Sequence, residues 1–140
     1  MPRTLVALAV TVGICLLAAG CGGDKRLRTQ GRVLKDGQAL VPKEGESVRV
    51  TFVPILPDGK PPADHYFAEF NRADATFQSA GKDKKGMPPG KYRVAVEFKK
   101  NRKGPDVLRG QFDENRSPFV FDVDSQTPEI TIDLDHPPKK

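Results

Sequence analysis

The stretch Lys91-Tyr92-Arg93-Val94-Ala95-Val96-Glu97-Phe98 decides the fold, because apolar residues recur along it at every second position. In an extended chain Tyr92, Val94, Val96 and Phe98 fall on one face, and the charged residues fall on the other. An alternation of period two indicates a β-strand with one face in a core and the other face in water. The stretch therefore predicts an amphipathic strand.

Other segments repeat this alternation. Three of them are predicted as strands on the same grounds, namely residues 47–53, 118–123 and 129–135. Three shorter candidates bring the count to about seven strands, namely residues 29–34, 66–70 and 75–79. Apolar spacing of three and four is not sustained in the rest of the domain, so no substantial helix is expected there.

Turn-forming residues separate the predicted strands. Lys35-Asp36-Gly37-Gln38, Pro57-Asp58-Gly59 and Asn71-Arg72-Ala73-Asp74 combine the residue types that reverse a chain. Short strands with turn signals at such spacing predict an all-β domain, either a sandwich or a barrel.

The N-terminal segment has the organisation of an export signal. Arg3 precedes an almost unbroken apolar run from Leu5 to Ala19, and small residues follow it. A run of about 15 apolar residues is shorter than the roughly 20 that a membrane-spanning helix needs, whereas it suits a signal peptide. A transmembrane anchor is therefore the second interpretation.

The end of this signal, Leu17-Ala18-Ala19-Gly20-Cys21, resembles the bacterial lipobox, in which a Cys after a small residue is acylated and becomes the first mature residue. The resemblance implies cleavage after Gly20, a lipid on Cys21, a signal peptide at residues 1–20 and a tether within residues 21–28. A free thiol at Cys21 is the alternative. An acylated Cys21 holds the exported chain on a membrane of the cell envelope, and Gly22 favours the outer membrane.

The turn Met87-Pro88-Pro89-Gly90-Lys91-Tyr92 enters the strand quoted first, and a Pro-Pro-Gly-Lys-Tyr turn in that place is similar to the carboxypeptidase regulatory-like domain. Residues 31–40 and 48–54 resemble the opening strands of that family, in the same order. The resemblance implies a single seven-stranded Greek-key-type β-sandwich, transthyretin-like, at residues 29–136, with a short polar tail at residues 137–140. It also implies a non-catalytic domain without a cofactor.

Side chains that carry chemistry are few. The two histidines, His65 and His136, lie in polar loops without a nucleophile and base at recognisable spacing, so a transthyretin-like hydrolase is only the third hypothesis. Four aspartates form two pairs on strand faces, namely Asp122 with Asp124 and Asp133 with Asp135. Neighbouring strands would bring these oxygens together for Ca²⁺, but charged strand faces in water are the favoured interpretation, and no metal site is predicted.

Basic residues cluster before and after the strand at residues 91–98. Candidate contacts to an anionic surface are Lys84, Lys85, Lys99, Lys100, Arg102 and Lys103. Each cation near an anionic surface contributes about 1 kcal/mol, which makes lipid headgroups and acidic glycans candidate partners. The alternative, two solvated loops at opposite ends of one strand, is favoured. Nucleic acid is not an expected partner, because the chain carries an export signal and no aromatic-basic platform.

The leading functional hypothesis is a membrane-anchored cell-envelope lipoprotein whose non-catalytic domain is a binding or structural accessory. Its partners are the lipid bilayer, through acylated Cys21, and an envelope protein or glycan. A carbohydrate or anionic-glycan recognition module is the alternative. Because the chain has no Trp, the aromatic contacts of such a module would be Tyr66, Phe67 and Phe112.

Overall fold

The computed structural model describes residues 25–127 and 129–139, and every regular element in this part is a β-strand. The eight strands are β1 (Gln30–Lys35), β2 (Gln38–Ala39), β3 (Ser47–Pro54), β4 (Tyr66–Asn71), β5 (Thr76–Ser79), β6 (Gly90–Lys99), β7 (Val120–Val123) and β8 (Ile130–Asp133). The predicted all-β class is therefore confirmed. Each of the seven predicted segments contains a strand, and the two-residue β2 is additional. The described residues contain no helix that could span a membrane.

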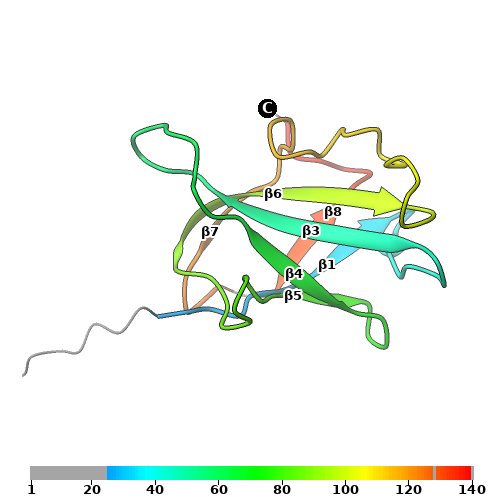
Figure 1. Ribbon diagram of the computed structural model, residues 1–140, viewed down its shortest axis with the longest axis horizontal. Coiled ribbons are helices and arrows are strands. Elements are labelled where there is room, and N and C mark those ends of the chain that lie inside the picture. Colours follow the sequence, from blue (N-terminus) through cyan, green and yellow to red (C-terminus); the bar gives the residue numbers. More distant parts are fainter. Residues whose placement is uncertain (1–24, 128, 140) are drawn as a thin grey trace, which may run out of the picture.

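The strands form one strongly curled sheet, a half-barrel (Figure 1). Its order is β2-β1-β5-β4-β3-β6-β7, and β8 pairs with β1. The β1–β8 pair is parallel and all other named pairs are antiparallel. In Figure 1, β3 and β6 cross in front of β1 and β8. This arrangement establishes the all-β class, but it does not establish a Greek-key sandwich.

The core lies inside the curl, and β3 and β6 supply its centre. These strands pair along their full length, with Phe52 opposite Val94 and Val50 opposite Val96. All four side chains are at most 2% exposed, as is Tyr92 on β6. The predicted inward face of the first quoted stretch is therefore confirmed. Burying large apolar side chains of this kind contributes about 1.5–3 kcal/mol each.

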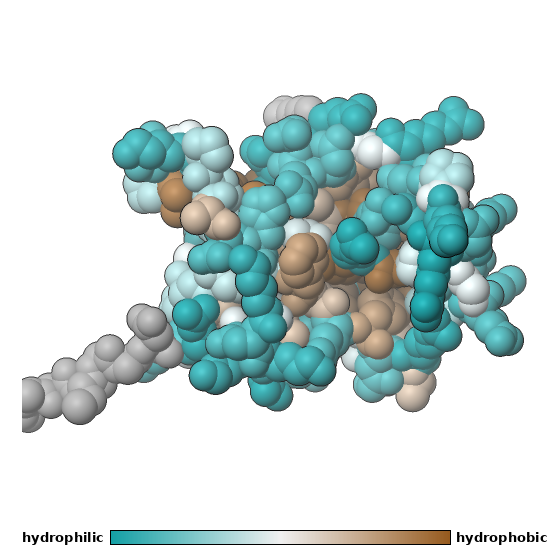
Figure 2. Space-filling model, viewed as in Figure 1, coloured by the Kyte–Doolittle hydropathy of each residue, from teal (hydrophilic) through white to brown (hydrophobic). Residues whose placement is uncertain are grey.

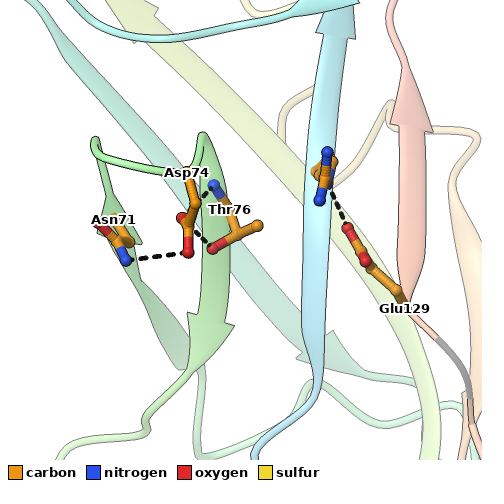
Figure 3. Close-up of polar contacts among 5 residues, drawn as sticks. Asn71, Asp74, Thr76 and Glu129 are labelled. Carbon is orange, nitrogen blue, oxygen red and sulfur yellow. Dashed lines mark hydrogen bonds and ion pairs between the residues drawn. The ribbon is translucent and has the colours of Figure 1, made fainter.

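The parallel pair β1–β8 closes the other side of the curl. Its register runs from Gly31 opposite Ile130 to Leu34 opposite Asp133. Glu129, directly before β8, accepts a hydrogen bond from Nε of Arg32 at 2.6 Å (Figure 3). Both side chains are exposed, so this ion pair adds little stability.

The turn between β4 and β5 is held by one carboxylate. Asp74 accepts hydrogen bonds from the amide (3.1 Å) and hydroxyl (2.6 Å) of Thr76, and from the side-chain amide of Asn71 at 3.1 Å (Figure 3). The hydroxyl bond from Thr76 lowers the pKa of Asp74 below its ordinary value. Ala75 adopts a φ of 56° in this turn, a left-handed conformation that glycine adopts more readily.

The domain begins at Leu27. The amide of Leu27 donates to the carbonyl of Met87 at 2.7 Å, and the amide of Met87 donates back at 2.9 Å. The Leu27 side chain packs against the core, and the hydroxyl of Ser79 donates to its carbonyl at 3.2 Å. The ordered domain thus starts two residues before the expected boundary at Thr29.

Candidate functional site

The half-barrel has two ends that differ in their distance from the N-terminus. The proximal end comprises residues 25–28 and the loops at 55–65 and 80–89, which lie on the left in Figure 1. The distal end comprises the loops at 40–46 and 100–110 and the turn at 72–75 on the right. The ten-residue strand β6 runs between the two ends and spans about 30 Å.

A cavity of about 460 Å³ opens at the proximal end. It lies between the 55–65 loop and the first residues of β6. Its walls are five prolines, two aliphatic side chains and two tyrosine rings, namely Pro54, Pro57, Pro62, Pro88, Pro89, Ile55, Leu56, Tyr66 and Tyr92. The cavity is therefore mainly apolar, and Asp64 and Lys91 supply its charged groups.

The Pro-Pro-Gly-Lys-Tyr turn forms one wall of this cavity and holds itself in place. The hydroxyl of Tyr92 donates to the carbonyl of Pro88 at 2.6 Å. Its ring meets the rings of Tyr66 and Phe52 edge to face, with centroids 6.0 and 6.1 Å apart. Burial raises the pKa of Tyr92 to about 12. The motif therefore has a structural role, because it fixes the turn to the core.

Basic side chains are frequent at the proximal end, although of the described ones only Lys91 lines the cavity. Eight exposed ones belong to the proximal end or its rim, namely Lys25, Arg26, Arg28, Lys60, Lys82, Lys84, Lys85 and Lys91. Seven acidic side chains lie at the same end, namely Asp58, Asp64, Glu69, Asp83, Asp122, Asp124 and Glu129, so the described residues of this end carry nearly balanced charge. Lys82 pairs with Asp64 at 3.1 Å and Lys84 pairs with Glu69 at 3.3 Å. Of the predicted anionic-surface contacts, Lys84 and Lys85 lie here.

The other four predicted basic residues, Lys99, Lys100, Arg102 and Lys103, lie at the distal end. The six candidates therefore form two separate groups, one at each end of β6, as expected from their positions in the sequence. The distal loop is organised by a carboxylate. Asp106 accepts hydrogen bonds from the amides of Phe98 (2.9 Å), Leu108 (3.1 Å) and Gly110 (2.8 Å).

The three aromatic candidates for glycan contact have different environments. Phe67 is 42% exposed on β4, and Figure 2 shows apolar surface gathered over β3 and β4 on the face in view. Tyr66 is half-buried against Tyr92. The prediction for Phe112 is wrong: the ring is 2% exposed and contacts Phe119 with centroids 5.4 Å apart.

The histidines and the aspartate pairs form no common centre. His65 pairs with Glu114 at 3.1 Å and His136 pairs with Asp133 at 3.1 Å. The hydrogen bond from His136 lowers the pKa of Asp133. Within residues 25–127 and 129–139, no group of three or more His, Cys, Asp or Glu side chains is placed to hold a metal ion.

The proximal end contains residues that the sequence did not single out. Leu56 is 38% exposed at the cavity rim, and Arg26 and Arg28 are exposed beside the point where the chain enters. The signals were present: an apolar Ile-Leu pair within a Pro-rich loop, and arginines shortly after a lipobox-like Cys.

The predicted lipidation residue Cys21, the cleavage residue Gly20 and the signal segment lie outside the described residues. Comparison of the chain with known protein families, curated proteins and solved structures found no match.

Proposed function

We propose that the protein is a lipoprotein of the bacterial cell envelope, anchored through acylated Cys21, whose β-domain is a non-catalytic binding or structural accessory. The observation that carries this proposal is the lipobox-like segment Leu17-Ala18-Ala19-Gly20-Cys21 after an apolar run, and the backbone pairing of Leu27 with Met87 fixes the chain at one end of the domain six residues after Cys21. Six residues span at most about 20 Å, so the lipid and the domain are closely coupled. The bilayer is the first partner, and an envelope protein or glycan is the second.

The environments of the histidines support a non-catalytic role. In the described part of the chain, neither His65 nor His136 is hydrogen-bonded to a Ser, Thr or Cys side chain, which nucleophilic catalysis would require. Each is instead paired with one carboxylate. The proposal includes a transthyretin-like fold, supported by the place of the Pro-Pro-Gly-Lys-Tyr turn at the start of the longest strand.

Glycan recognition is the second candidate function, and Phe67 supports it. Its exposed ring lies on the strand next to β3, where Arg49 pairs with Glu97 of β6 at 3.7 Å. An apolar ring beside charged hydrogen-bonding groups is suited to stacking on a sugar and bonding its hydroxyls. Glycan binding that is lost in Phe67→Ala, with the fold retained, would support this function.

The lipoprotein proposal is tested by replacing each cysteine in turn. We expect the wild type and Cys15→Ser to fractionate with membranes and Cys21→Ser to be released from them. Mass spectrometry of the N-terminal peptide should find a lipid-modified Cys21 as the first residue. Retention of Cys21→Ser in membranes at the wild-type level would overturn the proposal. Cross-linking of the wild type in native membranes then identifies the partner.

A further inference from the structure

Strand β3 is paired along its full length on one side only. It pairs with β6 from Ser47 to Pro54, whereas its ladder with β4 contains only Thr51 and Phe52. Beyond this point β4 turns away from β3 and pairs with β5. Figure 1 shows β3 and β4 spreading apart toward the distal end. In the described part of the chain, residues 47–50 therefore have no paired residue on the β4 side.

The alternation of hydrogen bonds shows which backbone groups are left free. The amide of Ile55 donates to the carbonyl of Lys91 at 2.8 Å, so the odd-numbered residues of β3 bond to β6 and the even-numbered ones point away from it. Strand β6 agrees, because the amide of Val96 donates at 2.9 Å to the carbonyl of Phe112, on the side away from β3. The amide and carbonyl of Val48 therefore face the β4 side, where the ladder has ended. Free backbone groups of this kind are a template for another strand.

A hollow of about 400 Å³ opens beside this free edge. We call it the β3–β4 hollow, and its lining is Ser47, Val48, Arg49, Phe67 and Ala68. Phe67 is 42% exposed and Val48 is half-buried, and Figure 2 shows apolar surface over these two strands. The hollow therefore combines free backbone groups with an exposed aromatic ring.

The charge around the β3–β4 hollow favours an uncharged occupant. Among the described residues, Arg49 is the only charged one in the lining, and it is paired with Glu97 at 3.7 Å. On the same face of β4, Glu69 is paired with Lys84 at 3.3 Å. Binding then depends on backbone hydrogen bonds and apolar contact, as when an extended peptide adds to the edge of a sheet. A sugar stacked on a ring does not require a free strand edge.

We propose that the β3–β4 hollow binds an uncharged, extended segment of an envelope protein, which adds to β3 at Val48 and packs an apolar side chain on Phe67. This inference rests on the proposed binding role of the domain and names the class of its partner, but it does not depend on the lipid at Cys21. Because the free edge comprises only residues 47–50, the complex is weak and reversible.

The experiment follows the free edge directly. The protein purified from cells is placed in phosphatidylcholine nanodiscs, and the probe is a pool of short, uncharged synthetic peptides in which apolar residues alternate with Ser or Thr. NMR measures the hydrogen exchange of backbone amides. Without peptide, the amide of Val48 should exchange faster than that of Arg49, which bonds to β6. With peptide, exchange at Val48 should become slower and exchange at Arg49 should not change.

Two proline variants test the backbone contact. Val48→Pro removes the free amide and should abolish binding, because proline cannot donate to a neighbouring strand. Val120→Pro is the matched control. Val120 is 40% exposed on β7, and its amide also points away from β6, since the amide of Val94 donates to the neighbouring carbonyl of Phe119 at 2.9 Å. Val120→Pro should bind the peptides like the wild type, and Phe67→Ala should bind roughly tenfold more weakly.

The outcomes separate this site from the other proposals. Unchanged binding by folded Val48→Pro, or no protection of the Val48 amide by any peptide of the pool, would overturn the peptide site. If Val48→Pro does not fold, the wild-type exchange and Phe67→Ala decide. Saccharide binding that requires Phe67 and persists in Val48→Pro would assign the ring to glycan recognition instead. Failure of peptide binding in a protein with lipid on Cys21 contradicts this inference alone and leaves the lipoprotein proposal intact.

Discussion

The proximal and distal ends present similar surfaces to solvent. Each carries a basic loop and exposed aliphatic side chains, Leu56 at the proximal end and Val41 and Val107 at the distal end. Their construction differs. An isolated β-bridge holds each end, Leu27 with Met87 at the proximal end and Lys99 with Asp106 at the distal end, but only the distal loop is also organised around a carboxylate, that of Asp106.

The comparison teaches that surface composition alone does not distinguish the two ends. What distinguishes the two ends is covalent connection and backbone geometry. Leu27 is paired with Met87 and packed against the core, so the first described residues are joined to the rest of the domain. The distal loop is also paired with the sheet, through the bridge between Lys99 and Asp106 and the bond from the amide of Val107 to the carbonyl of Phe98 at 2.7 Å, and the carboxylate of Asp106 adds three further hydrogen bonds.

The largest expected difference between the ends comes from their glycines. Gly86 has a φ of 98°, and an added Cβ would overlap the carbonyl of Leu27. Gly86→Ala should therefore lower the free energy of unfolding by about 3 kcal/mol.

At distal Gly104 the nearest atoms belong to the side chain of Asn101, which is exposed and can move. Gly104→Ala should cost at most about 0.5 kcal/mol. Urea denaturation of both variants measures the difference, and equal losses would remove the contrast in construction.

The second prediction uses pH to test the proximal end. The pKa of Tyr92 is raised from 10.0 to about 12, so in this range the unfolded chain releases the proton first. Stability due to the neutral hydroxyl is complete below pH 10.0 and is lost as the pH rises to about 12. The loss should amount to about 2 kcal/mol.

Tyr92→Phe is the matched variant. At neutral pH it should cost about 1 kcal/mol, because the carbonyl of Pro88 loses its hydrogen bond. Between pH 10.0 and about 12 the free energy of unfolding of Tyr92→Phe should fall by about 2 kcal/mol less than that of the wild type. Urea denaturation across this range compares the two proteins. Parallel pH curves would show that Tyr92 does not couple the turn to the core in the way described.

Local pattern was sufficient to predict much of the fold. Alternation placed Tyr92, Val94 and Val96 in the core, because a strand face is set by neighbours two residues apart. The Asp36-Gly37 turn was equally local: both residues adopt positive φ, 53° and 71°, which the hairpin requires.

The features that sequence did not predict depend on distant contacts. The parallel pairing of Gly31 with Ile130 joins the two ends of the domain sequence and has no local signal. Phe112 has polar neighbours, but its carbonyl accepts from the amide of Val96 at 2.9 Å, so the loop runs along β6 and the ring turns inward. The proximal cavity is predictable in part: the Pro-Pro-Gly-Lys-Tyr turn and the lysines are visible in the sequence, whereas the exposure of Leu56 depends on the position of the 55–65 loop.

The smallest expected effect concerns residues in left-handed conformations, one at each end. Arg109 has a φ of 52° at the distal end and Lys84 has a φ of 59° at the proximal end, and both are exposed. Glycine adopts this conformation without the steric cost of a Cβ, so Arg109→Gly should raise the free energy of unfolding by about 1 kcal/mol. Lys84→Gly should raise the free energy of unfolding by only about 0.5 kcal/mol, because it also removes the exposed ion pair with Glu69. Thermal denaturation in low and high salt separates the two terms. Salt screens only the ion pair, so at high salt the increase in stability from Lys84→Gly should approach the increase from Arg109→Gly. A difference between the two variants that persists at high salt would mean that the proximal turn requires Lys84 for another reason.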